Sequence, residues 1–516
     1  MLKAFIMYNQ VIGMRLRSVV IILMLTFISS VFEVFGIGIF YPIFQYIKSE
    51  ENLNILVADS DLWVRIIEVF NFLDFKISLV VLLVTAFLLF FVRQIILYVR
   101  VLYQARLASY LQSTLRYQIF SKYLNSNLSY QETLSAGGLT NIMINEVPQA
   151  VSAISIPIIF LIHVVMFVMY FVVLLMISFE MTLLSLLVFA LASRIPQGWI
   201  NKSKIIGKKL VDINMAVSTF IVSRFKSPRL VRLSGNEVIE KKFFLNLVNK
   251  LHSHNVTASI LSNRTDMVME PIVVLMSLFF LYIAYDLLSM SIEIIGLYMI
   301  VVVRLLPIIK GLIMSRQRLM SALGSLNIVK NRIDDMDKSS EKNSGILEFD
   351  GAFNRIIFKN ISYHYPNCND NTLNSVSFEI NSGEITAIVG PSGGGKSTLI
   401  DLLPRLRVPQ KGGMFIDGNN FDKFEINEFR GKIAYVPQNP QIFEGSISDH
   451  VQYGNPNIGE HEIKEACKLA GASYFIEELS DSYNSLIGED AIKLSGGQRQ
   501  RIDLARALAS NAQILI

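Results

Sequence analysis

Cysteine and charge are both scarce in this sequence. The two cysteines, Cys368 and Cys467, stand far apart, and neither has a second Cys or His at a metal-ligand spacing. A disulfide framework and a zinc site are therefore disfavoured, and we expect reduced thiols. Charged residues make up only 17% of the chain and hydrophobic residues 52%, with a mean hydropathy of +0.45. This balance excludes an ordinary soluble protein and predicts that part of the chain lies in lipid.

A cleavage site is also missing near the amino terminus. Basic residues up to Arg17 precede an apolar stretch from Val19 to about Ile47, which is the order found in a signal peptide. The stretch is longer than the about 7 to 15 residues of a typical signal sequence, and no small-residue cleavage site follows it. We therefore predict a retained first membrane helix.

Apolar runs long enough to cross a membrane, which takes ~20 residues, occur six times. The fourth run is short and is separated from the third only by Ser178, Phe179 and Glu180, which predicts a tight hairpin. The runs cover residues 19–47, 77–102, 156–177, 181–196, 267–288 and 292–313.

Lysine and arginine are absent from the connections after the third and fifth runs, whereas many lie between the fourth and fifth. Positively charged loops remain on the cytoplasmic side, so we expect a multi-pass protein of the cytoplasmic (inner) membrane with both termini in the cytoplasm. Helical patterns continue without breakers over 104–124 and 201–225. These patterns predict helices that project from the membrane.

The residue pattern of the sequence changes near Ile346. A charged run over 331–343 precedes strand-like segments at 356–358, 376–380 and 385–389, which alternate with Gly, Pro and Asn. We predict an all-α membrane domain over 1–335, a linker over 336–345 and a soluble α/β domain over 346–516.

One glycine-rich loop in the α/β domain has the spacing G-x-x-x-x-G-K-[ST]. A predicted strand at 384–389 precedes it and an apolar run at 399–403 follows it. Glycines let backbone N–H groups wrap a phosphate, a lysine reaches the β and γ phosphates, and the following hydroxyl binds Mg²⁺. The alternative is a structural glycine turn, which would not require a strand before the loop and a helix after it. The loop comprises Gly390, Pro391, Ser392, Gly393, Gly394, Gly395, Lys396, Ser397 and Thr398.

A second motif follows about a hundred residues later, formed by Leu494, Ser495, Gly496, Gly497 and Gln498 at the start of a helical pattern. LSGGQ after such a phosphate loop resembles the signature of the ABC transporter family and disfavours a kinase or GTPase. The whole chain resembles a type IV exporter half-transporter. The resemblance implies six membrane helices fused to a P-loop ABC ATPase.

The resemblance also implies roles for single residues. Tyr365 matches the aromatic that stacks on adenine, although a strand-edge aromatic beside Tyr363 is the alternative. Gln438 matches the glutamine that, with Ser397, contacts Mg²⁺. In the family the signature closes over ATP held by the other subunit, so a second half-transporter is required, as a homodimer or a heterodimer.

Further resemblances concern coupling and catalysis. Residues 130–147 and 225–243 resemble the two coupling regions, with an ordinary basic helix as the alternative for each, and Gly488, Glu489 and Asp490 resemble the exporter X-loop. The carboxylates of the Walker B motif and the switch histidine do not occur up to Ile516. We therefore assign no catalytic residue and interpret the sequence as truncated at its carboxyl end. The resemblance implies an ABC-type ATPase coupled to transport, whereas the sequence up to Ile516 alone is expected to bind ATP and Mg²⁺ without hydrolysing ATP.

Ionisable residues at membrane depth are costly and call for a role. Arg93 and Arg304 either bind an anionic group of the cargo or pair with Glu33 or snorkel. Residues 31–44 are similar to the first span of exporters that flip lipid-linked oligosaccharides. We predict ATP-driven export or flipping of an amphipathic, lipid-linked substrate, in contact with membrane lipid and without a nucleic-acid partner. The alternative is an ATP-gated channel or regulatory membrane protein; a peptide-processing exporter would need a protease domain before Val19.

Overall fold

The computed structural model describes residues 16–49, 61–72, 74–192, 194–341, 343, 345–366, 368, 370–487 and 494–516. The chain divides into two compact units. The helical unit contains Met1–Leu124 and Leu134–Lys338, and the α/β unit contains Asn125–Thr133 and Ser339–Ile516.

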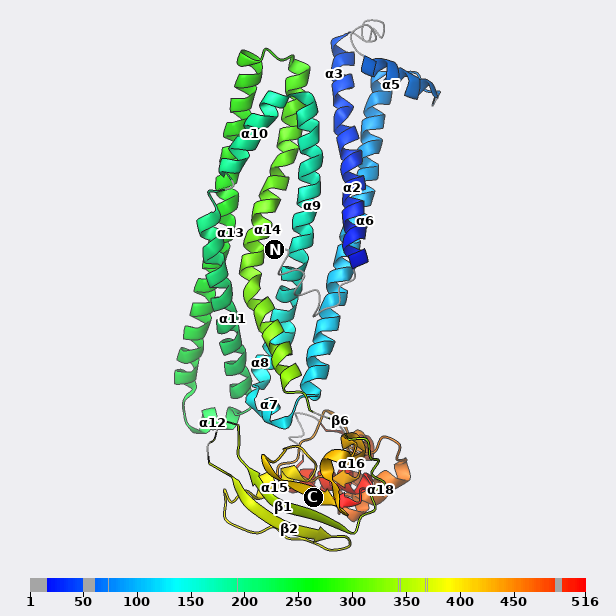
Figure 1. The fold of residues 1–516 in the computed structure, drawn as a ribbon, viewed down its shortest axis with the longest axis vertical. Coiled ribbons are helices and arrows are strands. Elements are labelled where there is room, and N and C mark those ends of the chain that lie inside the picture. Colours follow the sequence, from blue (N-terminus) through cyan, green and yellow to red (C-terminus); the bar gives the residue numbers. More distant parts are fainter. Residues whose placement is uncertain are drawn as a thin grey trace. The chain divides into compact units, whose positions relative to one another are not determined.

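Long helices make up nearly the whole of the helical unit (Figure 1). They follow the apolar runs of the sequence because a helix satisfies its own backbone hydrogen bonds in hydrocarbon. In chain order they are α2 (Leu16–Gly38), α3 (Phe40–Lys48), α5 (Asp61–Phe72), α6 (Leu79–Leu124), α8 (Ala136–Asn141), the π-helix η1 (Ile142–Glu146), α9 (Val147–Ile177), α10 (Phe179–Ala192), α11 (Gln197–Phe225), α12 (Pro228–Leu233), α13 (Glu237–Tyr282), the π-helix η2 (Ile283–Leu287) and α14 (Ile292–Lys338).

Five helical segments among the described residues are long and apolar enough to cross a membrane. They correspond to the first, second, third, fifth and sixth predicted spans. The fourth predicted span becomes α10, which has only 14 residues. Pro196 lies just before α11, where its missing N–H does no harm, and the same residue would have broken a continuous helix.

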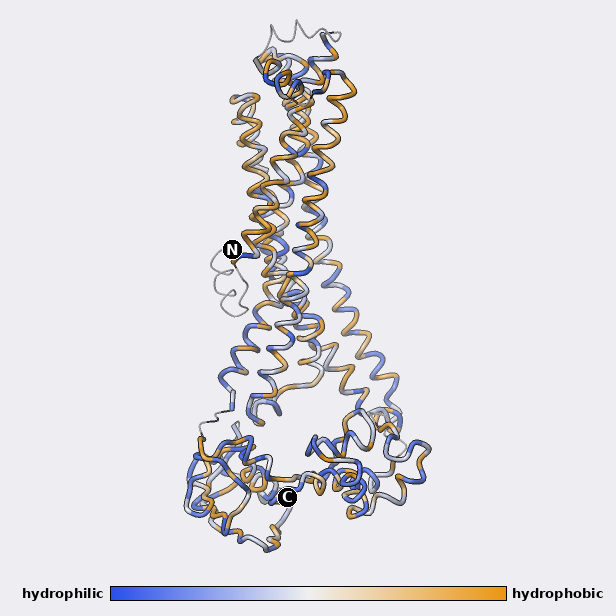
Figure 2. The backbone as a smooth tube through the Cα atoms, turned by 90° about the vertical axis from the view of Figure 1, so that its right-hand side faces the viewer, coloured by the Kyte–Doolittle hydropathy of each residue, from blue (hydrophilic) through white to orange (hydrophobic). Residues whose placement is uncertain are grey.

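Several helices continue far beyond their apolar parts. The helices α6, α13 and α14 have 46, 46 and 47 residues. Figure 2 shows hydrophobic residues along the upper part of these helices and more hydrophilic residues along the lower part. The predicted helices over 104–124 and 201–225 both form, within α6 and α11. Only the first continues a membrane span without a break, because α11 begins after the turn at Pro196.

The packing core of the helical unit lies between α9, α13 and α14. Tyr170 and Leu174 of α9 pack with Phe280 of α13 and with Tyr298 and Val301 of α14, and all five are buried. Farther along, α11 touches α14 so closely that a Cβ on Gly207 would lie 2.1 Å from the carbonyl oxygen of Ser321. Only glycine permits this crossing.

The α/β unit is built on an antiparallel sheet with the strand order β2-β1-β3-β4. Its strands are β1 (Arg355–Tyr363), β2 (Leu373–Asn381), β3 (Lys411–Ile416) and β4 (Asn419–Asn420). Two further strand pairs are parallel β5 (Ile433–Ala434) with β8 (Ile514–Leu515) and antiparallel β6 (Gly445–Ser446) with β7 (Leu486–Ile487). The helical elements are α7 (Leu128–Thr133), α15 (Lys396–Leu402), η3 (Phe421–Lys423), α16 (Ile426–Gly431), α17 (Ile447–Gln452), α18 (Glu460–Leu469), α19 (Ser473–Glu477), η4 (Ser482–Asn484) and α20 (Gly496–Ala509).

Two of the three predicted strands in this unit form. Residues 356–358 lie in β1 and residues 376–380 in β2, where Phe358 stacks on Phe378. Residues 384–389 do not join a sheet among the described residues, and Ile385 and Val389 are exposed. A strand requires a neighbour for its ladder, so an apolar run alone did not predict pairing here.

The two cysteines are both free, as expected. Cys368 is exposed, whereas Cys467 is buried in the cluster that packs α17, α18 and α20 together. Burial raises the pKa of the Cys467 thiol to about 11. Cys467 is therefore an inert packing residue.

Candidate functional site

The glycine-rich loop connects the exposed segment after β2 to the start of α15. Gly393 and Gly395 have φ angles of +81° and +83°, which other residues adopt only at a cost. At Gly395 a Cβ would also lie 2.8 Å from Cδ2 of Leu373, so glycine is required for two reasons. Glycine is therefore required by the backbone conformation of this loop.

The lysine of this loop turns back across it. Nζ of Lys396 donates to the carbonyl oxygens of Gly390 and Pro391 at 3.0 and 2.7 Å. The residues Pro391 to Gly394 are exposed, and Ser397 follows them at the start of α15. An ammonium group, exposed backbone and a hydroxyl therefore occur together, and this set suits a Mg²⁺-bound polyphosphate.

Tyr365 follows β1 and lies beside this loop. Its hydroxyl is 3.0 Å from Oγ1 of Thr398, the last loop residue, and its ring meets Tyr363 edge to face with centroids 5.4 Å apart. The guanidinium of Arg407 lies 4.8 Å from the centroid of the Tyr365 ring. These contacts hold Tyr365 beside the loop.

Arg407 itself connects several parts of the α/β unit. Its Nε donates to Asp401 at 2.9 Å, and its Nη2 donates to Glu132 of α7 at 2.6 Å. Burial alone would lower the pKa of Arg407, but the hydrogen bonds to Asp401, Glu132 and Tyr363 outweigh burial and raise it. The segment Asn125–Thr133, whose last four residues fall in the first predicted coupling region, therefore contacts the rest of the α/β unit through the same arginine that lies beside Tyr365.

The LSGGQ motif forms the start of α20, where two of its side chains cap the helix. Oγ of Ser495 accepts from the backbone N–H of Gln498 at 3.2 Å, and Oε1 of Gln498 accepts from the N–H of Ser495 at 2.8 Å. This reciprocal capping box leaves the other amides of the first turn available. A Cβ on Gly496 or Gly497 would meet nothing within 4 Å, so open space adjoins the positive end of the helix.

Gln438 lies in a segment after β5, and its carbonyl oxygen accepts from Nε2 of Gln500 on α20 at 3.4 Å. The structure therefore links the predicted Mg²⁺ glutamine to the signature helix through its backbone. The predicted X-loop residues Gly488, Glu489 and Asp490 lie outside the described residues.

A second candidate site lies in the helical unit, as a cavity of about 420 Å³. Arg304 lies 12 residues after the start of α14 at Ile292, which is roughly 18 Å at the helical rise of 1.5 Å per residue. Arg93, on α6, lines the same cavity. The ionisable residues that line the cavity are Glu33, Arg93, Arg100, His163, Tyr170 and Arg304.

The charges around this cavity do not balance. Glu33 is buried and lies 2.9 Å from Nη2 of Arg93 and 4.0 Å from Nη1 of Arg304. Three arginines therefore face one glutamate. The predicted pairing with Glu33 is present, but it neutralises one arginine at most.

Sequence reasoning missed Arg100 and Arg407. Arg100 follows Arg93 by seven residues, which is two helical turns, so the spacing already placed both on one face of α6. Arg407 carries no local signal, because its partners come from residues 132, 363, 365 and 401.

Family models match both units of the chain. Residues 19–306 match the ABC transporter transmembrane region, and residues 373–516 match the ABC transporter family. The chain belongs to the ABC transporter family. The predicted half-transporter, with a helical membrane domain followed by an ABC ATPase domain, is thereby confirmed.

Alignments with similar proteins extend over most of this ABC transporter. The heterocyst differentiation ATP-binding protein HepA of Nostoc sp. is 31% identical over 415 residues, which cover 79% of this chain and 67% of that protein. An ATP-dependent lipid A-core flippase of Photorhabdus laumondii is 27% identical over 410 residues, which cover 78% and 70%. A solved bacterial Atm1-family ABC exporter with ATP bound matches with a TM-score of 0.77 and 18% identity, covering 98% and 85% of the two chains, and this likeness shows the fold.

Proposed function

We propose that this ABC transporter uses ATP to export or flip an anionic amphiphile, with a lipid-linked molecule as the class of cargo. The observation that carries the proposal is the surplus of arginine around the cavity in the membrane helices. Uncompensated cations are costly at membrane depth, so an anionic partner stabilises them. The lipid A-core flippase among the relatives supports an amphipathic cargo.

The residues of the α/β unit fit ATP and Mg²⁺. Tyr365 would stack on the adenine, and the loop from Gly390 to Thr398 would hold the phosphates with Lys396. Ser397 and Gln438 would hold Mg²⁺, which neutralises phosphate charge. Each of these residues contributes binding or orientation.

The signature motif requires a second subunit in this proposal. Gly496 and Gly497 adjoin open space, and the capping box uses the amides of Ser495 and Gln498 while those of the two glycines remain available. We propose a homodimer in which this helix end faces the phosphates bound by the other copy. The complex would lie in the cytoplasmic (inner) membrane with both termini in the cytoplasm.

The arginines can be tested in the whole protein reconstituted in vesicles. Arg304→Gln is the cleaner variant, because its side chain is 47% exposed and lies only at 4.0 Å from Glu33. Losing one hydrogen bond to a charged group costs ~1.5–3 kcal/mol of binding free energy. The concentration of anionic amphiphile that gives half-maximal ATPase stimulation should therefore rise about tenfold or more.

Arg106→Gln is the matched control, since Arg106 lies on the same helix as Arg93 and Arg100 but does not line the cavity. Unchanged stimulation in Arg304→Gln and in Arg100→Gln would contradict the proposed anion site. Accumulation of cargo in sealed vesicles separates a pump from an ATP-gated channel, which would only equilibrate it.

A further inference from the structure

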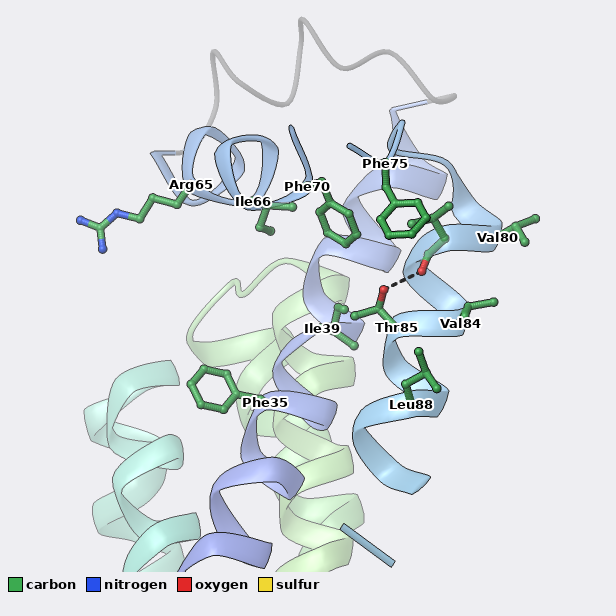
Figure 3. A pocket seen from close by; sticks show the side chains of 11 residues that line it. Phe35, Ile39, Arg65, Ile66, Phe70, Phe75, Val80, Val84, Thr85 and Leu88 are labelled. Carbon is green, nitrogen blue, oxygen red and sulfur yellow. Dashed lines mark hydrogen bonds between the residues drawn. The ribbon is translucent and has the colours of Figure 1, made fainter. Parts of the chain in front are cut away.

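A second pocket of the helical unit lies at the start of α6 and plays no part in the proposed function so far. Its volume is about 660 Å³, which is within the usual range of ligand pockets. Helices α2 and α6 form its walls, and α5 lies across one end (Figure 3). The lining residues are Phe35, Ile39, Arg65, Ile66, Phe70, Phe75, Val80, Val81, Val84, Thr85 and Leu88.

The lining is almost entirely hydrocarbon. Val80, Val84 and Leu88 form one stripe on α6, because residues four apart lie on the same helix face. The hydroxyl of Thr85 donates to the carbonyl oxygen of Val81 at 2.8 Å, so it offers no free donor to a ligand (Figure 3). The pocket therefore suits an apolar chain and cannot recognise a polar one.

The roof helix α5 is held firmly in place. Nε1 of Trp63 donates to Oε1 of Gln45 at 2.8 Å, and its ring lies 6.2 Å from that of Tyr46, so α5 is attached to α3. Phe70 is buried in the same cluster, together with Leu82 of α6. The pocket is consequently a built feature with a fixed roof.

The position of the pocket indicates which molecules can enter it. Two of its walls belong to helices that can span the membrane, and Val80 to Leu88 occupy roughly the first 14 Å of α6 at 1.5 Å per residue. This depth corresponds to one leaflet of a hydrocarbon core ~30 Å thick. The other end of α6, at Leu124, leads directly into the segment that belongs to the α/β unit.

Arg65 gives the rim of the pocket a positive charge. It lies on α5, and its side chain extends away from the apolar lining (Figure 3). A cation at the polar edge and hydrocarbon inside are the two parts needed to bind an anionic lipid.

We propose that this pocket holds a hydrocarbon chain of an anionic membrane lipid in the leaflet around the Leu79 end of α6, with the lipid headgroup beside Arg65. The inference goes beyond the proposed function, because it concerns the opposite end of α6 and does not use the charged cavity. Lipid would enter sideways from the bilayer, since the walls are themselves membrane helices.

Trp63 offers a reporter for this proposal, because the chain has only two tryptophans. In a Trp199→Phe background, Trp63 is the sole tryptophan, and it packs in the same cluster as Ile39, Ile66 and Phe70. The whole protein would be placed in vesicles of phosphatidylglycerol with or without bromine in the middle of the chains. Brominated chains that enter the pocket should quench Trp63 fluorescence.

Val84→Phe should fill the pocket, whereas Leu83→Phe is the matched control on the neighbouring, non-lining position of α6. Val84 and Leu83 are 50% and 48% exposed. We expect quenching in Val84→Phe to fall towards the level of unbrominated lipid and quenching in Leu83→Phe to stay at the level of the parent. Equal quenching in the two variants would overturn the proposal. Unchanged quenching in Val84→Phe together with loss of the dimer would also overturn it, because the pocket would then be a contact with a second copy of this chain.

The headgroup is tested by replacing phosphatidylglycerol with phosphatidylcholine. A solvent-exposed ion pair is worth ~0.2–1 kcal/mol, so the anionic lipid should occupy the pocket about twofold better, and Arg65→Gln should abolish the preference. Equal quenching by both lipids in the parent protein would overturn the role of Arg65. None of these measurements uses ATP or Arg304, so failure here leaves the proposed export function standing, and failure of that function leaves this pocket standing.

Discussion

The contact between Glu132 and Arg407 gives a quantitative prediction about how the first coupling region is held. Glu132 is 47% exposed, so its ion pair with Arg407 is partly screened by solvent despite the distance of 2.6 Å. Such a pair contributes ~0.2–1 kcal/mol. In Glu132→Gln, Arg407 keeps Asp401 at 2.9 Å, so no buried charge is left without a partner.

Arg407→Gln should cost more, because it leaves the carboxylate of Asp401, which is only 17% exposed, without its cation. A buried polar group that loses its partner costs ~1–3 kcal/mol, and more when it is charged. The two variants therefore separate the contribution of α7 from that of the site around Tyr365.

Hydrogen exchange of the amides in α7 measures the effect locally, because partial opening is governed by the free energy of that segment. The amides of Tyr130 and Gln131 donate to Asn127 within it. A loss of about 1 kcal/mol corresponds to about fivefold faster exchange, so Glu132→Gln should accelerate exchange by up to this factor and Arg407→Gln by more.

Glu460→Gln is the control, since Glu460 pairs with Lys464 on the surface of α18 and does not touch α7. If exchange in α7 is the same in wild type, Glu132→Gln and Arg407→Gln, the ion pair does not hold this segment and the argument fails. Additive effects in the double variant would show that the two residues act independently.

Two further predictions concern the α/β unit. Gly395→Ala should weaken ATP binding by about tenfold or more, because a non-glycine residue in the left-handed conformation costs ~1–2 kcal/mol and the added Cβ also meets Leu373. Titration with a fluorescent ATP analogue measures the affinity, and an unchanged affinity would contradict the loop geometry. At Asp503, burial would raise the pKa, but the neighbouring imidazole of His450 and the hydrogen bond from Arg506 lower it overall. A carboxylate whose pKa is lowered in the folded state stabilises the fold at pH values above its unfolded pKa of about 3.9, and this stabilisation is lost as pH falls through the folded pKa. Asp503→Asn should therefore lower the unfolding temperature near pH 7 and lower it less near pH 3. An equal decrease at both pH values would refute this prediction.

The two contacts of Asp503 are unequal. Nε of Arg506 lies 2.7 Å from Oδ1, whereas Nε2 of His450 lies 3.4 Å away, near the limit for a hydrogen bond. We therefore attribute most of the stabilisation of the carboxylate to Arg506. Asp503 and Arg506 both belong to α20, whereas His450 belongs to α17, so the longer contact is the one that joins the signature helix to a neighbouring helix.

Local signals predicted those parts of the protein whose partners are close in sequence. The apolar runs predicted α2, α6, α9 and α14, because membrane helices satisfy their own hydrogen bonds. The glycine pattern predicted a backbone that wraps closely round a phosphate, and Gly393 and Gly395 have positive φ angles. The roles proposed for the loop and signature residues remain predictions.

Contacts between distant segments could not be predicted in this way. Arg407 acquires its environment only when α7, β1 and α15 come together, and no pattern near residue 407 signals that meeting. The pocket beneath α5 likewise depends on how a short amphipathic segment packs on α3. The apolar run at 384–389 shows the converse, since strand-like composition did not supply a partner strand.

Two ionic links join the first helices of the membrane domain to α14, and they differ in strength. At one end of α14, Nζ of Lys48 lies 2.6 Å from the buried carboxylate of Glu293. Deeper in the membrane, Glu33 is 2.9 Å from Arg93 but 4.0 Å from Arg304.

Because Glu33 already has a close partner in Arg93, Arg304 can exchange its 4.0 Å contact with Glu33 for a contact with an incoming anion at little cost. That exchange would loosen the deeper link while the link through Lys48 stays intact. Separating α3 from α14 would still require breaking the ion pair of Glu293, whose carboxylate is 8% exposed and would be costly to leave without a cation. We therefore expect cargo binding and opening at that end of the helices to be distinct steps, with their cost at different residues.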